Sequence, residues 1–247
     1  MSSVIESPFL LNRVIFFGRS LKEYRQMFDI DPAQWVGKKV LDVASGPASF
    51  AAEARGLGID TMACDPRYGG NRDQLYEQAR EDIAIGLERM KIQNTYCARK
   101  TPEEEMAYRR EKVKAMAAFA GDYSEMDATD RYIEASLPRL PFDSKSFDLV
   151  LCAHLLFVYS DLDTGGCLES SPFDYEFHLR SILEMLRVSR GEVRIYPISG
   201  VNQAEHPYLP RILGYLRGLN VETEIVPVEF KDIAGADRML RIKQIAS

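Results

Sequence analysis

The stretch "KKVLDVASGPASFAAEARGLGIDTMACDP", residues 38–66, constrains the fold of this chain more than any other segment. Its apolar run at 39–44 predicts a buried strand, and a second run at 60–65 predicts another. Between them, residues 49–58 predict a helix that ends at a glycine. That helix supplies the right-handed crossover that two parallel strands need. The segment therefore predicts a βαβ unit, whose first turn holds one glycine, Gly46.

The downstream sequence continues the alternation of strands and helices. Further strands are predicted at 131–136, 146–154, 191–198, 221–230 and 237–245, with helices at 171–189 and 206–220. Ser171 is the expected N-cap of the helix at 171–189, with Pro172 at its first position. We therefore expect residues 1–247 to form a single α/β domain of packed layers.

The first 35 residues are predicted to form an N-terminal helical arm. One face of its main helix carries Leu21, Tyr24, Met27 and Phe28. A short helical turn should follow, with Asp31 as its N-cap.

Residues 71–128 interrupt the alternation, because no strand returns within the length of an ordinary βαβ unit. Two helices are predicted there. The first carries Leu75, Ala79, Ile83, Leu87 and Met90 along one face. The second opens with a capping box of Thr101 and Glu104, and its expected apolar stripe is Met106, Val113, Ala117 and Ala120. The pair is interpreted as an inserted lid, with decoration of the sheet edge as the alternative.

The composition is typical of a soluble globular protein: 247 residues, 46% hydrophobic and 28% charged. A formal net charge of −6 argues against nucleic acid as a partner, although the basic segments 98–100 and 108–114 leave RNA open. The four cysteines form no C-x-x-C pair, so no metal site is expected. We see no signal peptide and no apolar run near about eighteen residues, which predicts a cytoplasmic protein without a membrane partner. The oligomeric state stays open.

Ligands of open parallel sheets bind outside the carboxyl ends of the strands, where the strand order reverses. Three segments should meet there: the turn after 39–44, the end of 60–65 and the end of 146–154. In the turn, Gly46 lets the backbone approach a ligand, and its small neighbours keep the loop thin. Asp65 can accept hydrogen bonds from ribose hydroxyls, or it can simply cap the following turn. The turn lacks G-x-G-x-x-G, which argues against a pyrophosphate and hence against a nicotinamide dehydrogenase.

Four stretches together resemble the class I S-adenosylmethionine-dependent methyltransferases. They are "VLDVASGPASF", "CDP", "ASLPRLPFDSKSFDLVLCAHLLFVY" and "LEMLRVSRGEVRIYPI", and they follow the family's order between residues 39 and 200. The family's first motif is an acid followed by alternating glycines. This chain keeps the acid, Asp42, and the middle glycine, Gly46, and has Ala44 and Ala48 at the outer positions.

The resemblance implies a Rossmann-like α/β fold, with a seven-stranded sheet in the order 3-2-1-4-5-7-6 and an antiparallel seventh strand. It implies S-adenosylmethionine as cofactor and S-adenosylhomocysteine as product. The implied cofactor-binding residues are Asp42, Ala44, Ser45, Gly46, Asp65, Pro66, Ser136, Leu137, Ala153 and His154. Among them, Asp65 would hold the ribose and Ser136 and Leu137 would flank the adenine. The family often has an acid before the adenine position, and both Glu134 and Ser136 are candidates for it here.

Two residues of the arm are added to this set. In related enzymes an arm folds over the cofactor, so Arg19 could pair with the methionine carboxylate and Tyr24 could lie close by. The alternative is a solvated arginine and a core tyrosine on a packing helix.

Methyl transfer from a sulfonium is an in-line displacement, so positioning and desolvation can carry much of the barrier. A base is needed only when the acceptor must lose a proton. His154 is the predicted base, because it follows the strand at 146–154 and imidazole titrates near neutrality; simple packing is the alternative. Tyr159, on the same loop, is predicted to orient the acceptor.

The sequence therefore predicts a methyltransferase that acts on a small-molecule acceptor. The arm and the insert favour a closed acceptor cavity. Two alternatives stay open: a cofactor-binding protein without transferase activity, which would serve as a regulator or scaffold, and an RNA methyltransferase.

Overall fold

The computed structural model describes residues 9–92, 101–124, 128–230 and 234–245. Its centre is a seven-stranded sheet in the order β3-β2-β1-β4-β5-β7-β6. The strands are β1 (Lys39–Val43), β2 (Asp60–Asp65), β3 (Tyr132–Glu134), β4 (Phe147–Ala153), β5 (Ser189–Tyr196), β6 (Val221–Pro227) and β7 (Arg238–Gln244). Strands β1 to β5 pair in parallel, whereas β7 runs antiparallel to both β5 and β6. The expected sheet order and the antiparallel seventh strand are confirmed.

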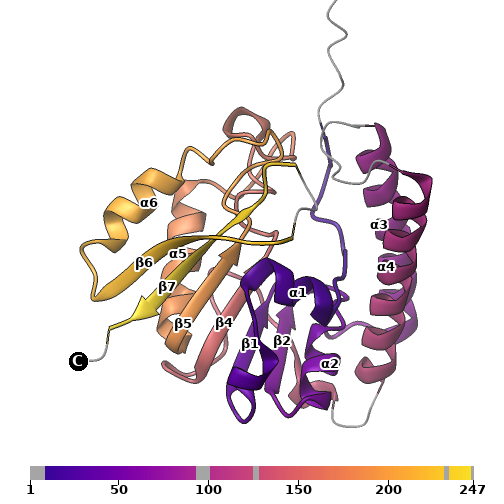
Figure 1. Ribbon diagram of the computed structural model, residues 1–247, viewed down its shortest axis with the longest axis horizontal. Coiled ribbons are helices and arrows are strands. Elements are labelled where there is room, and N and C mark those ends of the chain that lie inside the picture. The colour runs from indigo at the N-terminus through magenta and orange to yellow at the C-terminus, as the bar shows by residue number, and fades with distance from the viewer. Residues whose placement is uncertain (1–8, 93–100, 125–127, 231–233, 246–247) are drawn as a thin grey trace, which may run out of the picture.

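Helices cover both faces of the sheet (Figure 1). They are α1 (Leu21–Phe28), α2 (Phe50–Gly56), α3 (Arg72–Ile92), α4 (Pro102–Tyr123), α5 (Tyr175–Val188) and α6 (Leu209–Leu216), with short 3-10 turns at Pro32–Trp35, Ala128–Asp130 and Leu162–Thr164. Because side chains alternate along a strand, Val40 and Leu149 pack with α1 and α2, while Leu41 and Val150 pack with α5 and α6. The sheet is therefore the middle layer of three.

The N-terminal arm is helical only in part. Ser20 begins α1 as the N-cap of a capping box with Glu23. Asp31 caps the 3-10 turn that follows, as expected. Residues 9–19, which we call the strap, contain no helix and run between the sheet and the insert (Figure 1). The expectation of a helical arm therefore holds for the part from Leu21 onward.

The insert contains the two expected helices, α3 and α4, which lie side by side (Figure 1). On α3 the predicted face is confirmed, because Leu75, Ala79, Ile83 and Leu87 are buried and Met90 is half-buried. The capping box of Thr101 and Glu104 is also present at the start of α4.

The predicted apolar stripe of α4 is wrong. Met106 and Val113 are 52% and 48% exposed, Ala117 is exposed and Ala120 is only half-buried. The buried face consists of Lys112, Ala115, Met116 and Phe119. A lysine occupies this face because its ammonium forms a buried ion pair with Glu23 of α1. The partner is 89 residues away in the sequence, so helical periodicity gave no sign of it.

The expected start of α5 is also wrong. The N-cap is Asp174, whose carboxylate accepts the Phe177 N–H at 2.8 Å. Ser171 serves the preceding loop instead, because its hydroxyl donates to the Tyr159 carbonyl at 2.6 Å and accepts the Phe173 N–H. The loop after β4 is thereby extended by three residues before the helix begins.

Candidate active site

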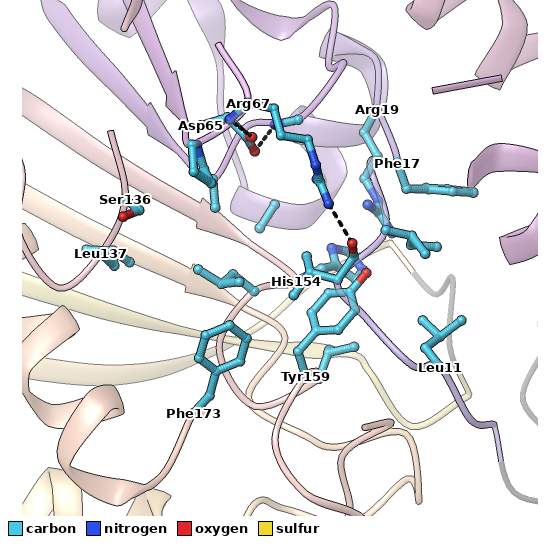
Figure 2. Close-up of a pocket in the computed structure, with 18 of the residues that line it drawn as sticks. Leu11, Phe17, Arg19, Asp65, Arg67, Ser136, Leu137, His154, Tyr159 and Phe173 are labelled. Atoms are coloured by element: carbon cyan, nitrogen blue, oxygen red, sulfur yellow. Dashed lines mark hydrogen bonds between the residues drawn. The ribbon is translucent and has the colours of Figure 1, made fainter. Parts of the chain in front are cut away.

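One cavity opens at the carboxyl ends of β1, β2, β3 and β4, and Figure 2 shows its lining. Its volume is about 230 Å³, just below the roughly 300–1,000 Å³ of most small-molecule sites. The predicted residues that line it are Arg19, Ala44, Gly46, Asp65, Pro66, Ser136, Leu137, Ala153, His154 and Tyr159. Segments far apart in the sequence thus meet at the edge where a ligand was expected.

The turn after β1 presents bare backbone to the cavity. Gly46 has φ +58° and Ala44 has φ +55°, both in the left-handed region. Glycine enters this region freely, whereas a residue with a Cβ is strained there by about 1–2 kcal/mol. Ala44 therefore adopts a backbone conformation that glycine enters freely, at a position where the family's motif has a glycine. The other outer position, Ala48, is buried and lies outside the left-handed region.

Three predicted residues lie behind this turn and not on the cavity wall. The Asp42 carboxylate accepts hydrogen bonds from the hydroxyls of Tyr24, at 2.8 Å, and Ser45, at 2.6 Å. The Tyr24 ring stacks on Phe50 with 4.3 Å between centroids. Burial raises the pKa of Asp42 to about 7, although both hydroxyls oppose this. These residues brace the turn from below, and Tyr24 matches the alternative of a core tyrosine.

Asp65 ends β2 on the cavity wall. One of its carboxylate oxygens accepts the Gly46 N–H at 3.2 Å, and the other accepts the Arg67 N–H at 3.0 Å. Burial raises the pKa of Asp65, and the two N–H groups and the Arg67 charge oppose this rise. The carboxylate thus ties the ends of β1 and β2 together, and it also caps its own turn. Each oxygen keeps a lone pair for a ligand hydroxyl.

The strap closes the cavity on one side. It contributes Phe9, Leu11, Val14, Ile15, Phe17 and Arg19 to the wall. The Leu11 N–H donates to the Cys167 carbonyl at 2.8 Å, and the Ser49 N–H donates to the Arg19 carbonyl at 3.0 Å. Arg67 crosses from the end of β2 and donates to the Val14 carbonyl at 2.7 Å (Figure 2). The strap is therefore bound to both rims of the cavity.

The insert holds the outer side of the strap. Asp82 of α3 is fully buried and accepts the Phe16 N–H at 2.6 Å. Asp82 also forms an ion pair with Arg13. The Nη1 of Arg13 donates at 2.8 Å to the same carboxylate oxygen that accepts the Phe16 N–H, and Nη2 donates to the other oxygen. Gly86 lies close to the strap, since a Cβ there would be 2.9 Å from the Phe17 ring. The described insert reaches the cavity only through Met90, so its action as a lid stays a prediction.

The two predicted catalytic residues both line the cavity. His154 follows β4 with φ +63°, and its ring lies edge-on to Tyr196 at 5.2 Å between centroids. Tyr159 is 8% exposed, and burial raises its pKa well above the ordinary value. A phenol is protonated near neutral pH even without this rise, so Tyr159 can donate a hydrogen bond.

The other two histidines have structural roles. They stack with 5.5 Å between ring centroids. His178 accepts the Phe157 N–H at 3.0 Å through Nε2. His206 accepts the Tyr208 N–H through Nδ1, so its Nε2 carries the hydrogen that faces Ser160 Oγ at 2.7 Å. Together they fix the loop after β4 that carries His154 and Tyr159.

Several cavity residues carried no recognisable sequence signal. Arg67 follows Asp65 in a turn, where a polar residue is ordinary. The strap residues and Met90 meet the cavity only through tertiary contacts. Phe173 and Phe177 also line the cavity. Their spacing of four residues is typical of neighbours on one face of a helix, and it was the one available signal that they lie together.

The described residues contain no group of three or more His, Cys, Asp or Glu side chains that could hold a metal ion. Cys64, Cys152 and Cys167 are buried free thiols, and Cys97 lies outside the described part.

Of the two basic segments, residues 98–100 also lie outside the described part. In the segment 108–114, Lys112 is buried in its ion pair with Glu23 and Lys114 lies 3.6 Å from Glu111. Within the described ranges, no helix is both long and apolar enough to cross a bilayer.

No known family model matches the chain. An uncharacterized protein of Methanocaldococcus jannaschii is 25% identical over 238 residues, which cover 95% of this chain and 98% of that protein. Among solved structures, magnesium protoporphyrin IX methyltransferase from Synechocystis is 12% identical, with 91% of this chain and 81% of that chain covered and a TM-score of 0.46. A putative S-adenosylmethionine-dependent methyltransferase from Methanococcus maripaludis is also 12% identical, with 92% and 84% covered and a TM-score of 0.46.

These likenesses are distant, and the strand order is the more telling feature. The order β3-β2-β1-β4-β5-β7-β6 with antiparallel β7 is the one implied by the resemblance. The chain has a Rossmann-like α/β fold with the strand order that the resemblance to the class I S-adenosylmethionine-dependent methyltransferases predicted. Its activity has to be argued from the residues of the cavity.

Proposed function

We propose that the protein is an S-adenosylmethionine-dependent methyltransferase that acts on a small-molecule acceptor. The observation that carries the proposal is the pairing of Asp65 with the Gly46 N–H on the cavity wall. The Asp65 carboxylate would accept hydrogen bonds from ribose hydroxyls beside a turn whose backbone lines the cavity. The same edge of the sheet carries Ser136 and Leu137, which would flank an adenine.

The residues present fit this cofactor. Ala44 and Gly46 leave room for the methionine half, since neither places a large side chain over the turn. Arg19 of the strap would bind the methionine carboxylate, because a guanidinium can donate two parallel hydrogen bonds to a carboxylate. When bound, S-adenosylmethionine supplies a methyl group on a positively charged sulfur. The long pyrophosphate of a dinucleotide finds no G-x-G-x-x-G turn here.

The chain's own groups would position the acceptor and exclude water. The strap and the loop after β4 enclose the cavity with apolar side chains, which favours desolvation of the reacting groups. Tyr159 would donate a hydrogen bond to the acceptor. Of the three histidines in the sequence, His154 alone lines the cavity, so it is the group that would take a proton from an acceptor that must lose one.

A small acceptor is favoured over RNA by the cavity and by the charges. The cavity is enclosed by the strap and is about 230 Å³ in volume, which leaves little access for a polymer. In the basic segment 108–114, Lys112 is buried in an ion pair with Glu23. The surface there therefore offers fewer cations to a phosphate backbone than the sequence suggests.

The test is methyl transfer from cofactor labelled in the methyl group. The protein is incubated with the labelled cofactor and, separately, with a deproteinised small-molecule extract and with total RNA. We expect label in an extractable small molecule, and a loss of transfer in His154→Ala if the acceptor must lose a proton. Label in RNA would support the RNA methyltransferase instead. Cofactor binding without transfer to either pool would support a binding protein.

A further inference from the structure

The cavity wall has two chemically different parts. The strand ends carry the polar groups proposed to hold the cofactor. The remaining wall is apolar and comes from the strap, α3, the loop after β4 and α5, and it includes Phe9, Leu11, Met90, Val158, Phe173 and Phe177. Phe173 and Phe177 pack together at 4.5 Å between ring centroids. We call this part the apolar wall, and flat rings suit such a surface.

Arg67 is the cation beside the apolar wall. Figure 2 shows its side chain reaching from the end of β2 toward the strap and Tyr159. One Nη2 hydrogen is used on the Val14 carbonyl at 2.7 Å, and the guanidinium lies 5.2 Å from the Phe16 ring centroid. Within the described ranges, its Nε and Nη1 hydrogens meet no acceptor. The guanidinium is thus held in place by Val14, and its Nε and Nη1 groups can donate hydrogen bonds to a ligand.

The cavity has little negative charge of its own to meet these donors. Asp65 is the one acid among the described residues that line it, and its two oxygens already accept the N–H groups of Gly46 and Arg67. The Tyr159 phenol is neutral near pH 7, since an ordinary tyrosine has a pKa of about 10 and burial raises this pKa further. A positively charged acceptor would therefore be repelled by Arg67 with only Asp65, of the described lining residues, to offset the repulsion, whereas an anionic acceptor would accept hydrogen bonds from the spare donors of Arg67.

We propose that the acceptor is an apolar, ring-bearing molecule with a single carboxylate, and that Arg67 binds this carboxylate. The rings lie on the apolar wall and the carboxylate faces the Nε and Nη1 hydrogens. This inference rests on the proposed function, since the apolar wall is an acceptor site only if the strand ends hold the cofactor. Arg67 is then the specificity-determining residue, while its bond to Val14 holds the strap beside the same ligand.

The experiment uses three probes of one shape and different charge: 2-naphthoate, 2-naphthamide and 2-naphthylmethylammonium. The full chain is first titrated with S-adenosylhomocysteine in a calorimeter and then, when saturated, with each probe. We expect the naphthoate to bind about tenfold more tightly than the amide, which is the usual worth of one charged hydrogen bond, and the ammonium to bind most weakly. Arg67→Gln should abolish this preference, and Arg67→Lys should retain part of it because the charge remains.

The control is Arg72→Gln. Arg72 is an exposed arginine at the start of α3 whose partner is Asp73, and its loss should leave the preference unchanged. Equal binding of the three probes to the saturated wild type would overturn the proposal, and so would a preference that persists in Arg67→Gln. Absence of S-adenosylhomocysteine binding in the first titration would instead count against the proposed function, so the two failures are distinguishable.

Discussion

Gly18 of the strap lies directly against the carbonyl of Pro47 in the turn after β1. A Cβ on Gly18 would be 2.0 Å from that carbonyl oxygen and 2.5 Å from its carbon. Neither backbone can yield without moving its whole segment. The position of the strap over the cavity and the shape of the turn therefore depend on each other at this contact.

We therefore predict that Gly18→Ala displaces the strap. Overpacking of this kind costs about 1–3 kcal/mol of unfolding free energy, and a shift near 1 Å in the turn should weaken S-adenosylhomocysteine binding at least about tenfold. Urea denaturation and calorimetric titration measure the two effects. Gly121→Ala is the matched control, because a Cβ at that position of α4 meets nothing within 4 Å. Wild-type affinity in Gly18→Ala would show that the strap does not shape the site.

Ala44 and Ala48 should respond oppositely to glycine. Ala44 has φ +55°, so Ala44→Gly should keep S-adenosylhomocysteine affinity and raise the unfolding free energy by up to about 1 kcal/mol through relief of strain. Ala48 is 1% exposed and not in the left-handed region, so Ala48→Gly should cost about 1 kcal/mol. Chemical denaturation of both variants gives the comparison. A loss of stability in Ala44→Gly as large as that in Ala48→Gly would contradict this account of the turn.

Asp82 is predicted to be the main anchor of the strap on the insert. Asp82→Ala leaves the buried Phe16 N–H without its acceptor, which should cost about 1–3 kcal/mol of unfolding free energy. The strap should also become open to limited proteolysis between residues 9 and 19. Asp73→Ala, on the same helix, removes only an exposed pair with Arg72 and should change stability by less than about 0.5 kcal/mol. Equal resistance of the two variants to protease would argue against the anchor.

His206 should make the protein less stable in acid. Burial and the neighbouring His178 lower its pKa from about 6.5 to about 3, so the unfolded chain takes up a proton between these values and the folded protein does not. The contribution of His206 is present above pH 6.5 and is lost as the pH falls toward 3, at no more than about 1.4 kcal/mol per pH unit. Urea denaturation from pH 7 to pH 4 should give a flatter profile for His206→Gln than for the wild type. Parallel profiles would contradict the lowered pKa.

The parts of the fold that follow a local pattern could be predicted from the sequence. The strand at Lys39–Val43, the capping box of Thr101 and the apolar face of α3 each depend on residues a few positions apart. The full sheet order depended in addition on the resemblance to a family. Strand ends differ from the prediction: the strand predicted at 131–136 is limited to Tyr132–Glu134.

The parts that failed depend on distant partners. Lys112 is buried on α4 because Glu23 lies opposite it, and no periodicity places a lysine inside. Ser171 was a reasonable cap before Pro172, yet its hydroxyl is used by the Tyr159 carbonyl. Arg67 enters the site because its guanidinium reaches Val14, 53 residues earlier. Such contacts arise only when the chain is folded.

The central claim is that Asp65 and the Gly46 turn bind the nucleoside of S-adenosylmethionine. Calorimetric titration with S-adenosylhomocysteine tests it most directly, on the wild type, Asp65→Ala and Asp148→Ala. Asp148 is the control, because it lies at the opposite end of the sheet and binds Arg190 and the Lys39 N–H. We predict binding to the wild type and to Asp148→Ala, and an affinity at least about tenfold lower in Asp65→Ala. No binding to the wild type, or equal binding to Asp65→Ala, would contradict the account.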